Sequence, residues 1–315
     1  MSTADADLSH WARVKESGSF FGMRLLLGIY RIGGKPLFQF CLLPVVLFYS
    51  VCHPVAVGAS RQYRRRMAQF NPAFPPPRPW HGFRHMWSFA NALLDKLAVW
   101  MGRIRPDDVV VHNREQVKAL LDRGQGAVLL ISHLGNFEVC QALSEHRSHL
   151  QLTVLHHTRH AEKFNRLLRL HNRDSRIEFI QVTDLNVAQA MRLSEQLAAG
   201  RFIVISADRM AVNNPGRAKV RSFLGRPAAF ATGPFVLASA LQAPIISLQC
   251  ILEEGRYHIY FDQLSEGGAV PRRQRDAALE QLMDAYIARL ENYCVKAPWQ
   301  WFNFYPYWRE DKEPS

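Results

Sequence analysis

His133 and Glu138 are the residues of this chain whose types and spacing could form a catalytic pair. They follow Val128–Ile131, a short apolar run typical of an internal strand covered on both faces. On one continuous helix the two side chains would point about 140° apart, so they could meet only across a turn. Gly135 and Asn136 predict that turn, because both tolerate left-handed backbone angles. The product would be a carboxylate-oriented imidazole, which is a general base.

Chance pairing of two surface residues is the alternative interpretation of His133 and Glu138. The strand, the glycine and the start of a helix favour the catalytic interpretation, because α/β proteins place active-site residues where strands end. Cys140 is the nearest alternative nucleophile. Its position inside the predicted helix, beside Val139, is more typical of a packed thiol than of a reactive one.

Three charged residues further along the chain could contribute to the same chemistry. Asp208 and Arg209 follow the apolar run Phe202–Ser206 at a second strand end, where the arginine could be the structural partner of the aspartate. Arg173 lies near the end of a predicted helix. Its guanidinium could bind an oxyanion or a phosphate through parallel hydrogen bonds, or it could simply interact with the dipole of that helix.

The block from Ser132 to Glu138 resembles the His-x4-Glu block of the bacterial late acyltransferases of lipid A biosynthesis, a branch of the lysophospholipid-acyltransferase superfamily. Later blocks follow at the spacing of that family: Asn172-Arg173, Ser206-Ala207-Asp208-Arg209, Phe223-Leu224-Gly225 and Thr232-Gly233-Pro234. The resemblance covers roughly residues 20 to 305. It implies transfer of a fatty acyl chain from acyl carrier protein to a hydroxyl of a lipid or glycolipid, at the cell inner membrane with the catalytic domain facing the cytoplasm.

Acyl transfer from a thioester needs a base for the acceptor hydroxyl and donors for the developing oxyanion. His133 is the expected base, and Glu138 is the acid expected to fix its tautomer and stabilise the imidazolium. The resemblance places a functional arginine at Arg173. The other blocks are expected to bind substrate through Asp208, Arg209, Gly225, Thr232 and Gly233.

Two departures from the related patterns bear on the acceptor. The glycerolipid branch of the superfamily has Asn-His-x4-Asp and a later Pro-Glu-Gly-Thr-Arg-Ser block, whereas this chain has Ser132 and Glu138, which disfavours a glycerophosphate acceptor. The run from Trp299 to Trp308 lacks the histidine and arginine of the Trp-x-x-His-x-Arg-type ending of lipid A members. It resembles the ending of divergent relatives from fatty-acid-like and aryl-polyene pathways, so an aryl-polyene pigment or another lipid is an alternative acceptor.

The formal charge of +12, from 39 Lys and Arg against 27 Asp and Glu, favours an anionic partner. A membrane surface, an acidic carrier protein and a nucleic acid would each satisfy it, so charge alone does not choose among them. With the resemblance, we expect acyl carrier protein, a lipid or glycolipid acceptor and an anionic membrane surface as partners, and no nucleic acid. A non-catalytic basic scaffold and a lipid hydrolase are the alternative functions.

Neither a metal nor another cofactor is expected. The five cysteines are scattered without a Cys-x-x-Cys pair, which argues against a zinc site or a disulfide framework and fits a reducing, cytoplasm-facing compartment. His156, His157 and His160 lack the carboxylate of a His-Glu-x-x-His site, so they predict a polar loop. The chain has no glycine-rich phosphate loop, dinucleotide fingerprint or nucleophile elbow.

The sequence divides into an N-terminal segment (1–69), a proline-rich connector (70–82) and an acyltransferase catalytic domain (83–315). No cleaved signal peptide is expected, since no basic region precedes an apolar stretch with a small-residue cleavage site. Leu37–Ala59 contains no Lys, Arg, Asp or Glu. It is long enough to be a membrane anchor, because a bilayer core needs about 20 helical residues.

The form of this anchor is open from sequence. Pro44 and Pro54 would kink a helix, so a re-entrant or interfacial segment competes with a true span, and a buried helix of a soluble protein is a third possibility. Arg61, Arg64, Arg65 and Arg66 follow the segment, but basic residues precede it as well. Charge on both flanks favours monotopic insertion.

Alternating strand and helix patterns predict an α/β fold, a layered mixed sheet flanked by helices. An amphipathic aromatic helix, Phe83–Met101, should precede it. The predicted strands are Val109–Val111, Ala127–Ser132, Leu152–His156, Ile177–Gln181, Phe202–Ala207, Ile245–Ile251 and Tyr257–Phe261. The predicted helices are Arg114–Arg123, Phe137–His146, Ala161–Arg173, Leu185–Ala199, Gly233–Leu241 and Arg275–Val295.

Overall fold

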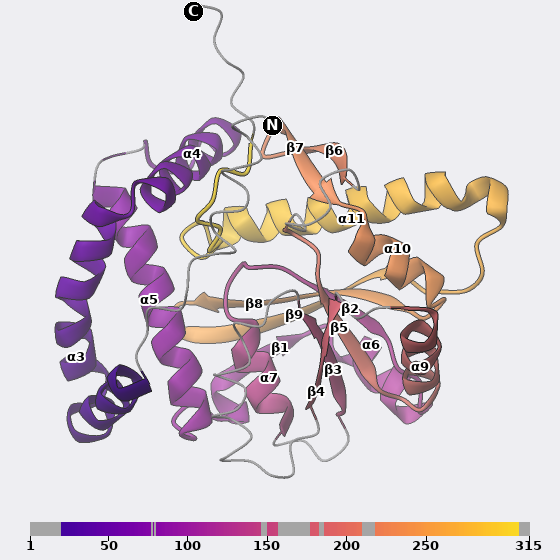
Figure 1. The fold of residues 1–315 in the computed structure, drawn as a ribbon, viewed down its shortest axis with the longest axis horizontal. Coiled ribbons are helices and arrows are strands. Elements are labelled where there is room, and N and C mark those ends of the chain that lie inside the picture. Colours follow the sequence, from indigo (N-terminus) through magenta and orange to yellow (C-terminus); the bar gives the residue numbers. More distant parts are fainter. Residues whose placement is uncertain are drawn as a thin grey trace, which may run out of the picture.

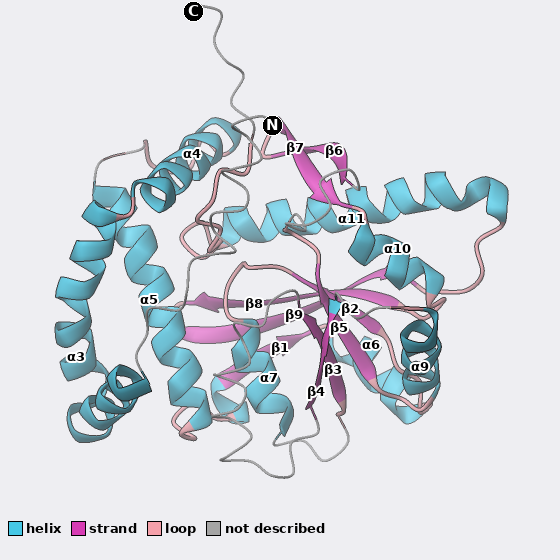
Figure 2. Ribbon diagram, viewed as in Figure 1, coloured by secondary structure: helices cyan, strands magenta, loops and turns pink. Residues whose placement is uncertain are grey.

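The computed structural model describes residues 20–76, 78, 80–145, 150–156, 177–182, 186–209 and 218–308. Its centre is a seven-stranded sheet in the order β1-β9-β8-β2-β5-β3-β4, with helices on both faces (Figures 1 and 2). Neighbouring strands are parallel except β8 and β9. The strands are β1 (Val109–His112), β2 (Val128–Ile131), β3 (Leu152–His156), β4 (Ile177–Gln181), β5 (Phe202–Ser206), β8 (Ile245–Glu253) and β9 (Arg256–Ser265). The predicted layered mixed sheet is confirmed.

The central strands are apolar throughout because both of their faces are covered. In β2, Val128 and Leu130 join a core with residues of α9, α10 and α11, while Leu129 and Ile131 join a second core with residues of α6 and α7. The covering helices are α6 (Arg114–Asp122), α7 (Phe137–Glu145), α9 (Val187–Ala198), α10 (Gly233–Ala240) and α11 (Arg275–Lys296). Short 3-10 helices lie at Pro106–Asp108 and Arg272–Gln274. The predicted helix Ala161–Arg173 lies outside the described residues.

A two-stranded hairpin was not predicted from sequence. It consists of β6 (Ala218–Phe223) and β7 (Arg226–Ala231), joined by Leu224 and Gly225 with φ of 50° and 72°. Positive φ at both residues suits a two-residue hairpin loop, because its twist matches that of the strands. The backbone N–H of Leu224 donates to Glu291 Oε1 on α11 at 2.5 Å, which holds the turn against that helix.

The N-terminal part consists of three helices: α3 (Phe20–Cys52), α4 (Pro54–Phe70) and α5 (Trp80–Trp100). Helices α3 and α5 lie side by side (Figure 1), joined by hydrogen bonds from Lys35 Nζ to Asp95 Oδ1 (2.9 Å) and from Gln39 Nε2 to Asn91 Oδ1 (2.6 Å). The break between α3 and α4 falls at His53, directly before Pro54, which is the first residue of α4. The expected apolar segment, residues 37 to 59, therefore belongs to two helices rather than one.

One helix among the described residues is long and apolar enough to cross a membrane, by length and composition. This stretch is Ile32–Cys52 of α3, and only 11% of its most apolar window is buried. Pro44 lies inside α3 without ending it, whereas Gly34 interrupts the helical geometry with φ of 64°. The structure thus retains an apolar, exposed helix as a weak candidate for the predicted anchor.

Candidate active site

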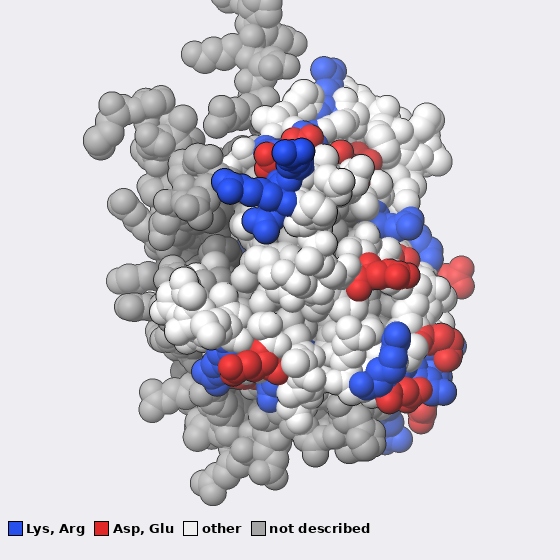
Figure 3. Space-filling view, turned by 90° about the vertical axis from the view of Figure 1, so that its right-hand side faces the viewer, with Lys and Arg blue, Asp and Glu red and all other residues white. Residues whose placement is uncertain are grey.

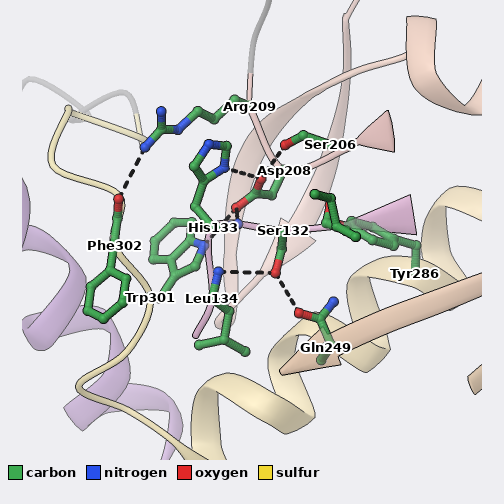
Figure 4. A network of polar contacts seen from close by, with 11 residues as sticks. Ser132, His133, Leu134, Ser206, Asp208, Arg209, Gln249, Tyr286, Trp301 and Phe302 are labelled. Carbon is green, nitrogen blue, oxygen red and sulfur yellow. Dashed lines mark hydrogen bonds and ion pairs between the residues drawn. The ribbon is translucent and has the colours of Figure 1, made fainter. Parts of the chain in front are cut away.

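His133 and Asp208 lie together because they follow two neighbouring parallel strands. Strands β2 and β5 pair with Ile131 opposite Ser206, so the residues after each strand meet at the same edge of the sheet. The Nδ1 atom of His133 donates to Asp208 Oδ1 at 2.7 Å. The backbone N–H of His133 donates to Asp208 Oδ2 at 2.8 Å. One carboxylate therefore fixes both the ring and the backbone of the histidine (Figure 4).

Asp208 is an ionised acceptor in a fully buried position. Burial acts to raise its pKa, but the charge and hydrogen bonds of His133, with the charge of Arg209, outweigh burial and lower the pKa to about 2. Trp301 Nε1 (3.1 Å) and Ser206 Oγ (3.2 Å) also donate to this carboxylate. An aspartate that accepts four hydrogen bonds has no proton to give, so the proton of the neutral imidazole resides on Nδ1.

The opposite ring nitrogen of His133, Nε2, then carries the lone pair. It makes no hydrogen bond to any residue that the structure describes, and the side chain of His133 is 32% exposed. An accessible, oriented imidazole with a free lone pair is the geometry of a general base.

The turn after His133 is held by strand β8 and by the segment around Trp301. Gly135 has φ of 74°, and a Cβ atom there would lie 1.9 Å from the carbonyl oxygen of Cys250, so the position requires glycine. The Gly135 N–H donates to Gln300 O at 2.8 Å, and the Phe302 N–H donates to His133 O at 2.9 Å. Asn136 does not adopt the left-handed angles expected for it.

The floor beneath this turn is a buried polar network (Figure 4). Ser132 Oγ donates to Gln249 Oε1 at 2.6 Å and accepts from the Leu134 N–H at 3.2 Å. Tyr286 of α11 donates its hydroxyl proton to Ile131 O at 2.8 Å. Because each group is paired inside the protein, the strand end has little freedom to shift.

The sequence model of one protein family, described as bacterial lipid A biosynthesis acyltransferase, matches residues 81–310. The match covers well over half of the chain and includes His133 and Asp208. The chain belongs to this family. The family indicates an acyltransferase of the lipid A type, in agreement with the resemblance of the sequence blocks. Curated proteins give no significant match.

In this family member, Glu138 is not the direct partner of His133 that the sequence led us to expect. Its Oε1 atom accepts from Lys96 Nζ of α5 at 2.9 Å, and its side chain is 40% exposed. Burial acts to raise the pKa of Glu138, but Lys96, and more weakly the charge of His133, outweigh burial and lower the pKa. Glu138 therefore acts on His133 through its charge, whereas Asp208 holds Nδ1.

Arg209 connects the end of β5 to the segment after Trp301. Its guanidinium donates to Phe302 O at 3.1 Å and lies over the ring of Tyr305, 5.7 Å from the ring centroid. The positive charge helps to lower the pKa of Asp208. The structural partnership predicted for the two residues stays a prediction.

The remaining predicted substrate residues are dispersed over other elements. Arg173 lies outside the described residues. Gly225 lies in the β6–β7 turn, Thr232 precedes α10 and Gly233 begins it. No hydrogen bond among the described contacts joins Gly225, Thr232 or Gly233 to His133, so their role in a groove stays a prediction.

The other candidate sites from the sequence gain no support. Cys140 lies within α7 and is half-buried. This position inside a helix is the one that its interpretation as a packed thiol requires. His156 ends β3, while His157 and His160 lie outside the described residues. Within the part of the chain that the structure describes, no group of three or more His, Cys, Asp and Glu residues could hold a metal ion.

Two residues of the site were missed from sequence, Trp301 and His85. A buried chain of hydrogen bonds runs from Ser60 Oγ to His85 Nδ1 (3.0 Å), from His85 Nε2 to Trp301 O (3.0 Å) and from Trp301 Nε1 to Asp208. Burial lowers the pKa of His85 to about 4, and the charge of Arg64 adds to this, so the ring is neutral near pH 7. The aromatic run from Trp299 to Trp308 was a visible signal, but no motif marked His85.

Proposed function

We propose that the protein transfers a fatty acyl chain from acyl carrier protein to a hydroxyl of a lipid or glycolipid. The observation that carries the proposal is the pair formed by His133 and Asp208, with a Nδ1–Oδ1 distance of 2.7 Å and an exposed imidazole edge. A base of this kind suits the proton transfer that acyl transfer to a hydroxyl requires.

The proposed reaction needs no covalent acyl-enzyme. His133 Nε2 removes the proton of the acceptor hydroxyl while that oxygen attacks the thioester carbonyl. The tetrahedral intermediate then breaks its carbon–sulfur bond, and the imidazolium returns the proton to the leaving thiolate. Asp208 stabilises the imidazolium through Nδ1, as an aspartate does in a catalytic triad. Glu138 adds a second negative charge nearby.

The other substrate contacts are part of the same proposal. Arg173 and Arg209 would stabilise the oxyanion or bind an acidic group of a substrate. Gly225, Thr232 and Gly233 would form part of the groove for the acyl chain.

We place this activity at the cell inner membrane, with the catalytic domain facing the cytoplasm. The exposed apolar residues of α3 support a membrane contact; they include Ile32, Phe40, Phe48 and Val51, which are 88%, 74%, 58% and 80% exposed. The net charge of +12 supports an anionic bilayer surface and an acidic carrier protein, because electrostatic steering speeds encounter with a large anionic partner.

A second acceptor class, an aryl-polyene pigment or another lipid, is favoured by the position of the divergent C-terminal run. Trp301 donates to Asp208 and Phe302 donates to His133 O, so the part of the sequence that departs from the lipid A pattern touches the site itself. A substitution of Trp301 or Phe302 would alter the surroundings of His133 without altering the histidine itself.

The test is incubation of the purified full chain with acyl carrier protein bearing a labelled acyl group and total membrane lipid, followed by mass spectrometry of the labelled product. Labelled lipid A species support the first acceptor class, and a labelled polyene or other lipid supports the second. Label found only in free fatty acid would replace transfer by hydrolysis. A His133→Ala protein serves as the inactive control.

A further inference from the structure

Helices α4 and α5 enclose a pocket rich in arginine, away from His133. Its volume is about 330 Å³, and Ser50 near the C-terminal end of α3 is one of the residues that line it. None of the residues that line it belongs to the His133 site. Four of them are arginines: Arg61, Arg64, Arg65 and Arg78.

Arg64 is the most informative of these residues, because it is charged and only 4% exposed. Its Nε donates to Ser60 O and its Nη1 donates to Arg78 O, both at 3.2 Å. Burial lowers the pKa of Arg64 to about 10, and the charges of Arg61 and Arg65 act in the same direction. A guanidinium satisfied only by carbonyl oxygens is hydrogen-bonded but not neutralised.

No carboxylate among the described residues lies within ion-pair distance of the four pocket arginines. Some basic side chains elsewhere do pair with acids, as in Lys219–Glu280 at 2.5 Å and Arg192–Glu178 at 2.7 Å. The face on the side of α9 accordingly shows blue and red side chains close to one another (Figure 3). What distinguishes the pocket is that four arginines share one cavity without a described acid, and that one of them, Arg64, is buried. A bound anion would supply the counter-charge that the described residues do not.

The walls of the pocket are apolar as well as basic. Val57, Phe83 and Met86 line it together with the arginines. At Gly82 a Cβ atom would lie 3.3 Å from Arg64 Nη2, so the glycine leaves space beside the buried guanidinium. The ligand must therefore combine an anionic group, which the arginines bind, with an apolar part, which the walls contact.

The position of the pocket limits the chemical class of its ligand further. Ser50 of α3 lines it, and the apolar residues just before and after this serine are exposed, with Phe48 at 58% and Val51 at 80%. An anion-binding site at the end of an exposed apolar helix matches the layout of a lipid, whose phosphate lies above its acyl chains. We propose that the arginine pocket binds the phosphate group of a membrane lipid, with the acyl chains lying along α3.

The test measures binding rather than acyl transfer, so it stands apart from the proposed reaction. The full chain in a phosphate-free non-ionic detergent, dodecyl maltoside, is titrated by calorimetry with dihexanoylphosphatidic acid and, separately, with inorganic phosphate. The pocket variant is Arg61→Gln/Arg65→Gln, because both side chains are exposed and their replacement leaves the fold intact. The charge-matched control is Arg66→Gln/Arg114→Gln, which removes two positive charges outside the pocket.

We expect saturable binding of dihexanoylphosphatidic acid by the wild-type chain, and a dissociation constant at least about tenfold higher in the pocket variant, because two charged donors are lost. The control should stay within about twofold of wild type, and inorganic phosphate should bind at least about tenfold more weakly than the lipid. An equal loss in the control, no loss in the pocket variant, or equal affinity for inorganic phosphate would each overturn the proposal.

Discussion

Replacing Asp208 by asparagine tests which acid orients the catalytic histidine. The amide is nearly isosteric but offers an NH2 group where the carboxylate accepts from His133 Nδ1 at 2.7 Å. The ring would then carry its proton on Nε2 and lose the lone pair that accepts the substrate proton. The same substitution lowers kcat about 10⁴-fold in the serine protease triad, so we expect a loss of about 10³- to 10⁴-fold here.

The assay is steady-state transfer from labelled acyl carrier protein to the acceptor identified by mass spectrometry, with circular dichroism to verify folding. Glu138→Gln is the matched control, because Glu138 pairs with Lys96 rather than with His133 Nδ1. We expect its loss of kcat to be smaller, since it removes a charge without changing the tautomer. A folded Asp208→Asn protein within tenfold of wild type, or a larger loss in Glu138→Gln, would refute the assignment of roles.

The same carboxylate makes a testable contribution to stability. The folded pKa of Asp208, about 2, lies below that of an ordinary aspartate, so folding favours the ionised form. The ionised group therefore contributes about 2 kcal/mol at neutral pH, fully present above about pH 4 and lost as the pH falls toward about 2. Urea denaturation at stepped pH should show this loss in the wild type and not in Asp208→Asn.

Four further outcomes follow from the site. His133→Ala should lower kcat by about 10²- to 10⁴-fold in a folded protein, measured by the same transfer assay, and near-wild-type turnover would remove the mechanism. Trp301→Phe removes the donor 3.1 Å from Asp208 Oδ2 and should lower kcat about tenfold, a smaller loss than Asp208→Asn; equal losses would show that the tryptophan does more than position the acid. Gly135→Ala should destabilise the protein by more than about 2 kcal/mol in urea, because its Cβ would collide with Cys250 O, and an unchanged unfolding midpoint would contradict the tight approach. Transfer from acyl carrier protein should exceed transfer from coenzyme A at low ionic strength and approach it as salt rises past about 0.1 M; a preference that is insensitive to salt would exclude electrostatic steering.

The sheet was predictable because each of its main strands can be recognised from its own local composition. Runs such as Phe202–Ser206 are rich in apolar and β-branched residues, because a strand that is buried on both faces has few positions for polar side chains. The β6–β7 hairpin lacked that signal, since β6 is largely exposed or half-buried, β7 contains Pro227, and its turn has Leu224 in place of the usual asparagine.

The partner of His133 was less predictable, because the contact depends on topology. Glu138 was favoured by its nearness in sequence, whereas Asp208 becomes a neighbour only when β5 is placed beside β2 in the strand order. Once that order is known, the pairing of Ile131 with Ser206 brings the two strand ends together. His85 is harder still, since its contact with Trp301 O spans 216 positions of the sequence and follows no pattern.

The late position of Trp301 in the chain has a consequence for biosynthesis. All strands of the sheet, β2 and β5 included, are synthesised before residues 300–302. Until then, His133 O, the Gly135 N–H and the carboxylate of Asp208 lack their partners from this segment. A nascent chain that ends before residue 300 therefore lacks the contacts that hold its base and acid, and the catalytic geometry can be completed only after residues 300–302 have been synthesised.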